Sequence, residues 1–195
     1  MLTLWTCRAV VAVGLVLAGR TAIAQTNATE KAPPASQGTK LFSIEALIME
    51  PADMGVDAKR SVDGMVINVK SPVKVIANDN VYPAASSGFQ EKNREHAAMG
   101  IHSWLSVSYK LEEAGKRVTV YVFEFEDAEK ARRIWTQRMG LPQFEEDPTR
   151  DLELKGSLFY KFLRGSVMLS IEWAEPKPSS ADRIITAYKS KLLSF

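Results

Sequence analysis

The chain has very little cysteine and histidine, with one cysteine and two histidines among 195 residues. Cys7 lies at the start of an apolar N-terminal stretch, so a chain cleaved after that stretch has neither a disulfide nor a thiol nucleophile. The glycines form no phosphate-binding loop or dinucleotide fingerprint, and no G-x-S-x-G sequence marks a serine nucleophile. We therefore expect no cofactor, and an ordinary apolar core in place of disulfides.

Long apolar runs are scarce as well, and the one at the N-terminus is short. Arg8 precedes the eleven-residue apolar run 9–19, whereas a membrane span needs about 20 apolar residues. Ala22-Ile23-Ala24 matches an A-x-A cleavage signal. We therefore expect a signal peptide over 1–24, no transmembrane segment after its cleavage, and export to a periplasm or the extracellular space.

The rest of the chain lacks an excess of charge of either sign. Cleavage would remove Arg8 and Arg20 from 25 basic residues, which leaves 23 against 23 acidic ones. The remaining charges alternate in sign and form no basic stripe, so the sequence argues against binding of nucleic acid or anionic lipid. An unknown protein partner or a small ligand is the expected partner.

Large apolar residues are nearly absent from 25–40, which we interpret as a flexible tether. Asn27 begins a glycosylation sequon, which matters only in a eukaryotic secretory pathway. The remaining residues, 41–195, have the usual size of one domain.

The clearest structural signal is an alternation of apolar and polar residues over 101–111, which predicts a strand. Residues 112–116 predict a hairpin turn with Gly115 in a left-handed conformation. The following run, 118–125, is apolar on both faces and predicts a central strand. Residues 157–163 and 166–173 predict a second hairpin joined through Arg164-Gly165.

Two helices follow these hairpins in the predicted order of elements. Asp127 is expected to cap a helix over 127–139, and Ser179-x-x-Asp182 predicts a capping box for a C-terminal helix. Strands are also expected at 62–69 and 73–76, a helix at 90–99, and either a strand or a helix at 41–49. Hairpins mixed with helices indicate an α+β fold, with a mainly antiparallel sheet and two or three helices packed on one face, in a single domain.

Few residues offer catalytic or metal-binding chemistry. His96 and His102 are weak metal candidates, because their spacing does not place them on one helical face. Glu124 and Glu126 are two residues apart at a strand end, so their carboxylates could serve glycoside hydrolysis if one had a raised pKa. Neighbouring charges favour a solvated strand end instead.

The tryptophans are the better candidates for ligand or partner binding. Trp104 falls on the polar face of its predicted strand, and Trp173 ends another strand beside Glu172. A helix covering that face would make Trp104 a core residue. We expect an exported, non-catalytic interaction or accessory module; the alternatives are a small-molecule binding module, with its ligand between the sheet and one helix, and a hydrolase.

Overall fold

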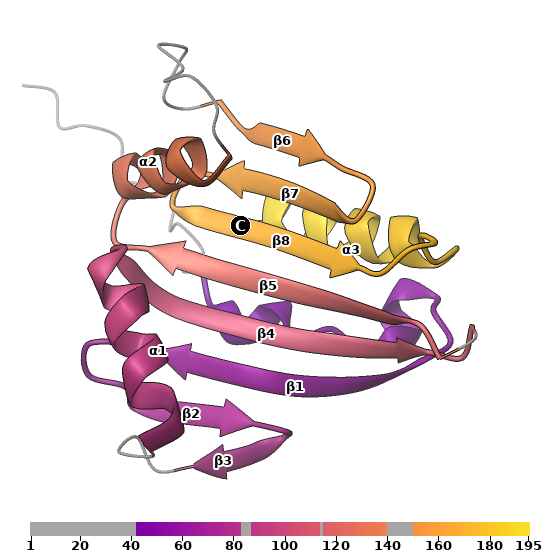
Figure 1. Ribbon diagram of the computed structural model, residues 1–195, viewed down its shortest axis with the longest axis horizontal. Helices are drawn as coiled ribbons and strands as arrows, with labels where there is room; N and C mark the ends of the chain where they lie inside the picture. The colour runs from indigo at the N-terminus through magenta and orange to yellow at the C-terminus, as the bar shows by residue number, and fades with distance from the viewer. Residues whose placement is uncertain (1–41, 83–86, 114, 140–149) are drawn as a thin grey trace, which may run out of the picture. The chain divides into compact units, whose positions relative to one another are not determined.

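The computed structural model describes residues 42–82, 87–113, 115–139 and 150–195, all within the compact unit Gly38–Phe195. These residues form an antiparallel eight-stranded sheet, in the order β3-β2-β1-β4-β5-β8-β7-β6, and three α-helices (Figure 1). The predicted α+β class is confirmed. The expected signal peptide, the tether and Cys7 lie outside the described residues.

The described chain alternates between short runs of strands and single helices. The strands are β1 (Ala58–Ile67), β2 (Lys74–Ala77), β3 (Asn80–Tyr82), β4 (Ile101–Leu111), β5 (Arg117–Phe125), β6 (Leu152–Lys155), β7 (Phe159–Arg164) and β8 (Val167–Trp173). The α-helices are α1 (Ser87–Ala98), α2 (Ala128–Met139) and α3 (Ala181–Leu193). Two 3₁₀ helices, η1 (Ile44–Leu47) and η2 (Pro51–Met54), precede β1.

The predicted central hairpin is confirmed as β4 and β5. These strands pair from Lys110 opposite Arg117 to Ile101 opposite Phe125. Gly115 has a φ of 67°, the left-handed conformation expected in the turn. β5 lies between β4 and β8, and its sequence is apolar on both faces because Val120 and Val122 pack into the core on one face and Phe125 into the core on the other.

The helix after this hairpin and the second hairpin also match their predictions. The carboxylate of Asp127 accepts a hydrogen bond of 2.7 Å from the backbone N–H of Lys130, so Asp127 caps α2 as expected. β7 and β8 pair tightly up to Arg164 opposite Val167, around the predicted turn.

Other local predictions differ from the structure. Segment 41–49 contains the 3₁₀ helix η1, and β6 has no counterpart among the predicted elements. The capping-box prediction is wrong: Ser180 is the N-cap of α3, and the hydroxyl of Ser179 donates to the carboxylate of Glu113 at 2.9 Å. The hydroxyl of Ser179 thus bonds to a residue distant in the sequence and does not cap the helix.

The helices lie on both faces of the sheet, whereas the sequence placed them on one. α3, η1 and η2 pack against one face, here called the α3 face, and α1 and α2 against the other (Figure 1). Successive residues of a strand point to opposite faces, and Trp104 and Leu105 are both large and apolar. Each face of the sheet therefore carries apolar side chains that a helix must cover.

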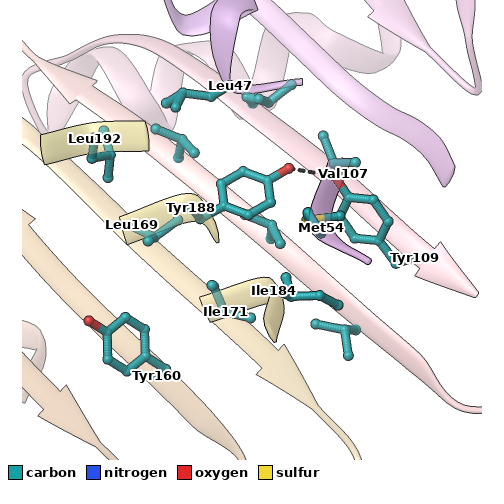
Figure 2. Packing of buried hydrophobic residues seen from close by; sticks show 14 of the residues in the cluster. Leu47, Met54, Val107, Tyr109, Tyr160, Leu169, Ile171, Ile184, Tyr188 and Leu192 are labelled. Carbon is teal, nitrogen blue, oxygen red and sulfur yellow. Dashed lines mark hydrogen bonds between the residues drawn. The ribbon is translucent and has the colours of Figure 1, made fainter. Parts of the chain in front are cut away.

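Two tyrosines join α3 to the centre of the sheet. The hydroxyls of Tyr188 and Tyr109 are 2.7 Å apart (Figure 2). Tyr109 donates to the backbone carbonyl of Met49 at 2.8 Å. A hydroxyl has one hydrogen, so Tyr188 must donate to Tyr109. Burial raises the pKa of Tyr109 to about 12 and that of Tyr188 well above its usual value, which keeps both hydroxyls protonated.

On the opposite face, α1 covers Trp104. The indole is 2% exposed, and its N–H donates to the amide oxygen of Asn93 at 3.1 Å. The ring of His96 meets the rings of Trp104 and Phe123 edge-on, with centroids 5.3 and 5.6 Å away. A Cβ at Gly64 would lie 2.6 Å from the indole, so this position of β1 has room only for glycine.

Replacing each hydroxyl of the tyrosine pair should have unequal effects. Tyr188→Phe removes one hydrogen bond and should lower the free energy of unfolding by about 1 kcal/mol. Tyr109→Phe leaves the Tyr188 hydroxyl and the Met49 carbonyl without their partner, so it should cost about 1–3 kcal/mol more. Urea unfolding of both variants and the double variant tests this order. Equal losses of unfolding free energy in the two single variants, or losses that simply add up in the double variant, would contradict a hydrogen bond donated by Tyr188 to Tyr109.

The pKa of His96 predicts a loss of stability in mild acid. Burial, with Lys92 and Arg138 nearby, lowers this pKa from 6.5 to about 4. Below pH 6.5 the unfolded chain therefore binds a proton that the folded chain does not. The free energy of unfolding should decrease as the pH is lowered from 6.5 to about 4. The loss should be on the order of 3 kcal/mol, since the pKa falls from 6.5 to about 4 and one pKa unit corresponds to about 1.4 kcal/mol.

Chemical unfolding of the wild type between these pH values measures that loss. His96→Phe should remove most of this dependence of the unfolding free energy on pH. His102 is exposed and provides the control, so His102→Gln should leave the dependence unchanged. Glu126 acts in a lower window, because hydrogen bonds from Lys130 and Lys70 lower its pKa from 4.5 to about 2. A His96→Phe variant with the slope of the wild type would contradict the assignment to His96.

Candidate functional site

A pocket of about 320 Å³ lies between α3 and strands β6, β7 and β8. We call it the α3 groove. Its apolar wall consists of side chains from both layers: Phe159, Tyr160, Trp173, Ile185 and Leu193. Its charged side chains are Glu153, Lys155, Lys177, Asp182 and Lys189. An apolar concave surface with a few convergent polar groups is the usual form of a small-molecule site.

The spacing of residues on α3 explains why the groove exists. The residues buried against the sheet are Ala181, Ile184, Tyr188 and Leu192. Ile185, Lys189 and Leu193 follow at intervals of four and so share the neighbouring face of the helix, which lines the groove. One helix thus anchors itself with one stripe and presents a second stripe to the pocket.

Strand pairing supplies the opposite wall. In the β6–β7 ladder, Lys155 lies opposite Tyr160 and Glu153 lies opposite Phe162, so all four share the α3 face of the sheet. Tyr160 and Phe162 are buried, while the two charged side chains stand on the edge strand β6. The groove therefore has a buried aromatic floor and a charged rim.

Two lysines share one carboxylate at this rim. Glu153 accepts from Lys189 at 2.7 Å and from Lys155 at 3.0 Å, one through each oxygen. These bonds, that of Lys189 first, lower the pKa of Glu153, which is therefore ionised at neutral pH. At the other end, Lys177 and Asp182 form a balanced pair at 2.6 Å. The Glu153 end thus carries one unbalanced positive charge.

Tyr160 is the unusual residue of the floor. It is 1% exposed, and no acceptor among the described residues meets its hydroxyl with good hydrogen-bond geometry, although the Glu153 carboxylate lies near it. Figure 2 places it away from the Tyr188–Tyr109 pair, on the side of the sheet nearer β6. Burial, with the Glu153 carboxylate close by, raises its pKa, so the hydroxyl keeps its proton. A buried donor without a well-formed hydrogen bond gains from an acceptor that is better placed.

Trp173, expected to bind a ligand or partner, is part of this groove. It is 7% exposed, and its indole N–H donates to the carbonyl of Ser157 at 2.9 Å. The ammonium of Lys177 lies 5.4 Å from the ring centroid. The N–H is therefore occupied, and Trp173 offers the groove its apolar ring.

Trp104, the other expected binding residue, lies outside the groove. It is buried under α1, and both its ring and its N–H contact residues of that helix. A partner would have to displace α1 to reach the indole. We therefore do not include Trp104 in the candidate site.

The two histidines occupy different environments. His96 is buried between Trp104 and Phe123, and its Nδ1 has no hydrogen-bond partner among the described residues. His102 is exposed on β4. Within the described ranges, no three or more side chains of His, Cys, Asp or Glu gather closely enough to hold a metal ion.

The paired glutamates stand at the end of β5. Glu124 is half-buried, and Glu126 follows the strand as an exposed residue bound to both Lys70 and Lys130. A general acid at neutral pH needs a raised pKa, whereas the pKa of Glu126 is about 2. The environment of Glu126 is that of a solvated strand end.

Sequence reasoning missed most of the groove. Tyr160 and Lys189 carried no signal of their own, because a buried tyrosine and a helical lysine are common. The alternation Leu152-Glu153-Leu154-Lys155 could have predicted β6. With β6 placed beside the predicted strand 157–163, Glu153 and Lys155 would have been candidates.

Comparison with known proteins adds no family assignment. Across the parts of the chain that the structure describes, no helix has the length and apolar character needed to cross a membrane. No protein-family model, curated protein or solved structure matches this chain.

Proposed function

We propose that this protein is an exported, non-catalytic binding module that holds a small ligand in the α3 groove. The observation that carries the proposal is the pocket itself, which has an apolar wall, a charged rim and, on its floor, a buried Tyr160 hydroxyl without a well-formed hydrogen bond. A ligand that offers this hydroxyl a better-placed acceptor stabilises the folded protein. The groove lies between the sheet and one helix, where the sequence placed the ligand of the alternative function.

The groove is better suited to binding than to catalysis. Among the described residues that line it, the ionisable groups are lysines and carboxylates held in ion pairs, together with a protonated tyrosine. The low pKa of Glu153 makes it a poor proton donor at neutral pH. The apolar wall stands on the regular elements β7, β8 and α3, which hold its side chains in place.

A second hollow has less to offer a ligand. It lies between α1 and the β1–β2 connection and is lined by Lys70, Asn93 and Arg94, among others. Asn93 already accepts from Trp104, and Lys70 is paired with Glu126. These two groups therefore already have partners within the protein.

Interaction with a protein partner is the second candidate function. It is favoured by exposed apolar side chains around the β2–β3 hairpin, where Val73, Val81 and Tyr82 are 80%, 69% and 39% exposed. β3 is also an edge strand of only three residues. Val81→Asp should weaken such an interaction without changing the groove, which lies at the opposite end of the sheet order.

Export is proposed from residues 1–24, with their short apolar run and A-x-A sequence. The mature chain should begin at Gln25 and contain no thiol, because Cys7 precedes the cleavage site. Intact-mass measurement and thiol titration of the protein from its native source check this. A mature chain that keeps Cys7 would contradict cleavage at this position.

Binding in the groove can be tested with the neutral fluorescent dye N-phenyl-1-naphthylamine. The folded protein should bind the dye saturably, because Trp173, Ile185 and Leu193 exclude water from its rings. Ile185→Trp should fill the groove and weaken dye binding about tenfold or more, since lost apolar contact of about 1.4 kcal/mol corresponds to tenfold in affinity.

The matched control is Leu158→Trp, which adds the same side chain at an exposed position that is not among the groove residues. This variant should bind the dye like the wild type, and thermal unfolding should establish that both variants are folded. Equal weakening by both substitutions would place the dye elsewhere. No saturable binding of the dye, or of octanoate, octanol or octylamine, would overturn the proposed function.

A further inference from the structure

We propose that the ligand of the α3 groove is a small amphipathic monoanion, a carboxylate attached to an apolar body. The inference rests on the proposed function and adds the chemical class of the ligand. Three features of the groove carry it: the uneven charge at the rim, the buried donor on the floor and the apolar wall between them.

The charge at the rim favours an anion. Lys155 and Lys189 contact opposite oxygens of Glu153, so two ammonium groups face one carboxylate. A bound carboxylate would complete two cation–anion pairs at this end. A cation would add a third positive charge. A dianion would leave an excess negative charge beside Glu153, so a monoanion matches best.

The floor supplies a specific donor for that carboxylate. The hydroxyl of Tyr160 can donate, and no acceptor among the described residues meets it with good hydrogen-bond geometry, although the Glu153 carboxylate is near. The hydroxyl is covered, so the ligand must displace the side chains above it, among which Glu153 lies close. The side chains of Glu153 and Lys189 are 33% and 32% exposed, and pairs that reach solvent contribute little to stability. Their rearrangement is therefore a small cost.

The wall fits an apolar body of limited length. Ile185 and Leu193 line the helix side, and the ring of Trp173 lies on the sheet side. Leu193 is 45% exposed in the free protein, so a ligand would cover an apolar side chain that water now contacts. At the far end Lys177 and Asp182 neutralise each other and offer no excess charge to a second polar group.

Competition with N-phenyl-1-naphthylamine separates the ligand classes. Octanoate, octanol and octylamine share an eight-carbon chain and differ in the charge of the head group. Octanoate should displace the dye at a concentration at least about tenfold lower than the other two, since a hydrogen bond to a charged group exceeds the 1.4 kcal/mol that corresponds to tenfold. Isothermal titration calorimetry with octanoate should give one site per chain.

Two conservative variants test the residues. Tyr160→Phe keeps the ring and should weaken octanoate binding about tenfold while the dye still binds. Lys189→Met keeps the length of the side chain and should weaken octanoate about fivefold, because it removes one charge–charge contact at the rim. The controls are Tyr121→Phe and Lys110→Met, which lie on the opposite face of the sheet and outside the groove and should leave octanoate affinity unchanged.

The outcomes distinguish the two proposals. Dye binding without a preference for octanoate, or with a preference for octylamine, overturns the ligand class and leaves the binding function standing. Unchanged octanoate affinity in Tyr160→Phe or in Lys189→Met also overturns it. Absence of binding by every probe overturns the function itself, and with it the ligand class.

Discussion

The hydrogen-bonded chain from Tyr188 through Tyr109 to the carbonyl of Met49 fixes the position that the rest of the α3 face depends on. It joins three segments far apart in the sequence: the C-terminal helix, the central strand β4 and the residues just after η1. Both hydroxyls are buried, so each must keep its partner. This requirement limits how α3 can rotate or slide over the sheet, because a small shift would leave buried donors and acceptors unpaired.

The groove follows from that anchoring. With Tyr188 and Ile184 held over the sheet, the next stripe of α3 must face the strands at the edge, where the sheet ends at β6. Edge strands are commonly protected by charged residues, and Glu153 and Lys155 serve that purpose on β6. The same two residues supply the rim of the groove. The charged side chains that protect the edge strand from pairing with another chain therefore also form the end of the groove that would attract an anion.

The sequence was informative where one local signal dominated. The alternation over 101–111 and the doubly apolar run after it predicted β4 and β5, because central strands must be apolar on the faces that helices cover. It was less informative where tertiary contacts decide. β6 is four residues long, and Ser179 could form either a helix cap or its observed bond to Glu113. The placement of helices on both faces required recognising that Trp104 and Leu105 each need cover.

The site was harder to predict than the fold because no segment contains it. Trp173 could be selected from its place at a strand end, but its role depends on α3 lying over β8. Tyr160 becomes a candidate only once its buried hydroxyl is seen to lack a well-formed hydrogen bond, a property of the assembled structure and of no sequence pattern. Buried polar groups are satisfied almost everywhere in folded proteins, so one that is not suggests a stability cost kept for another reason. In this protein the ligand proposed for the α3 groove provides that reason, because its carboxylate would accept a hydrogen bond from the Tyr160 hydroxyl.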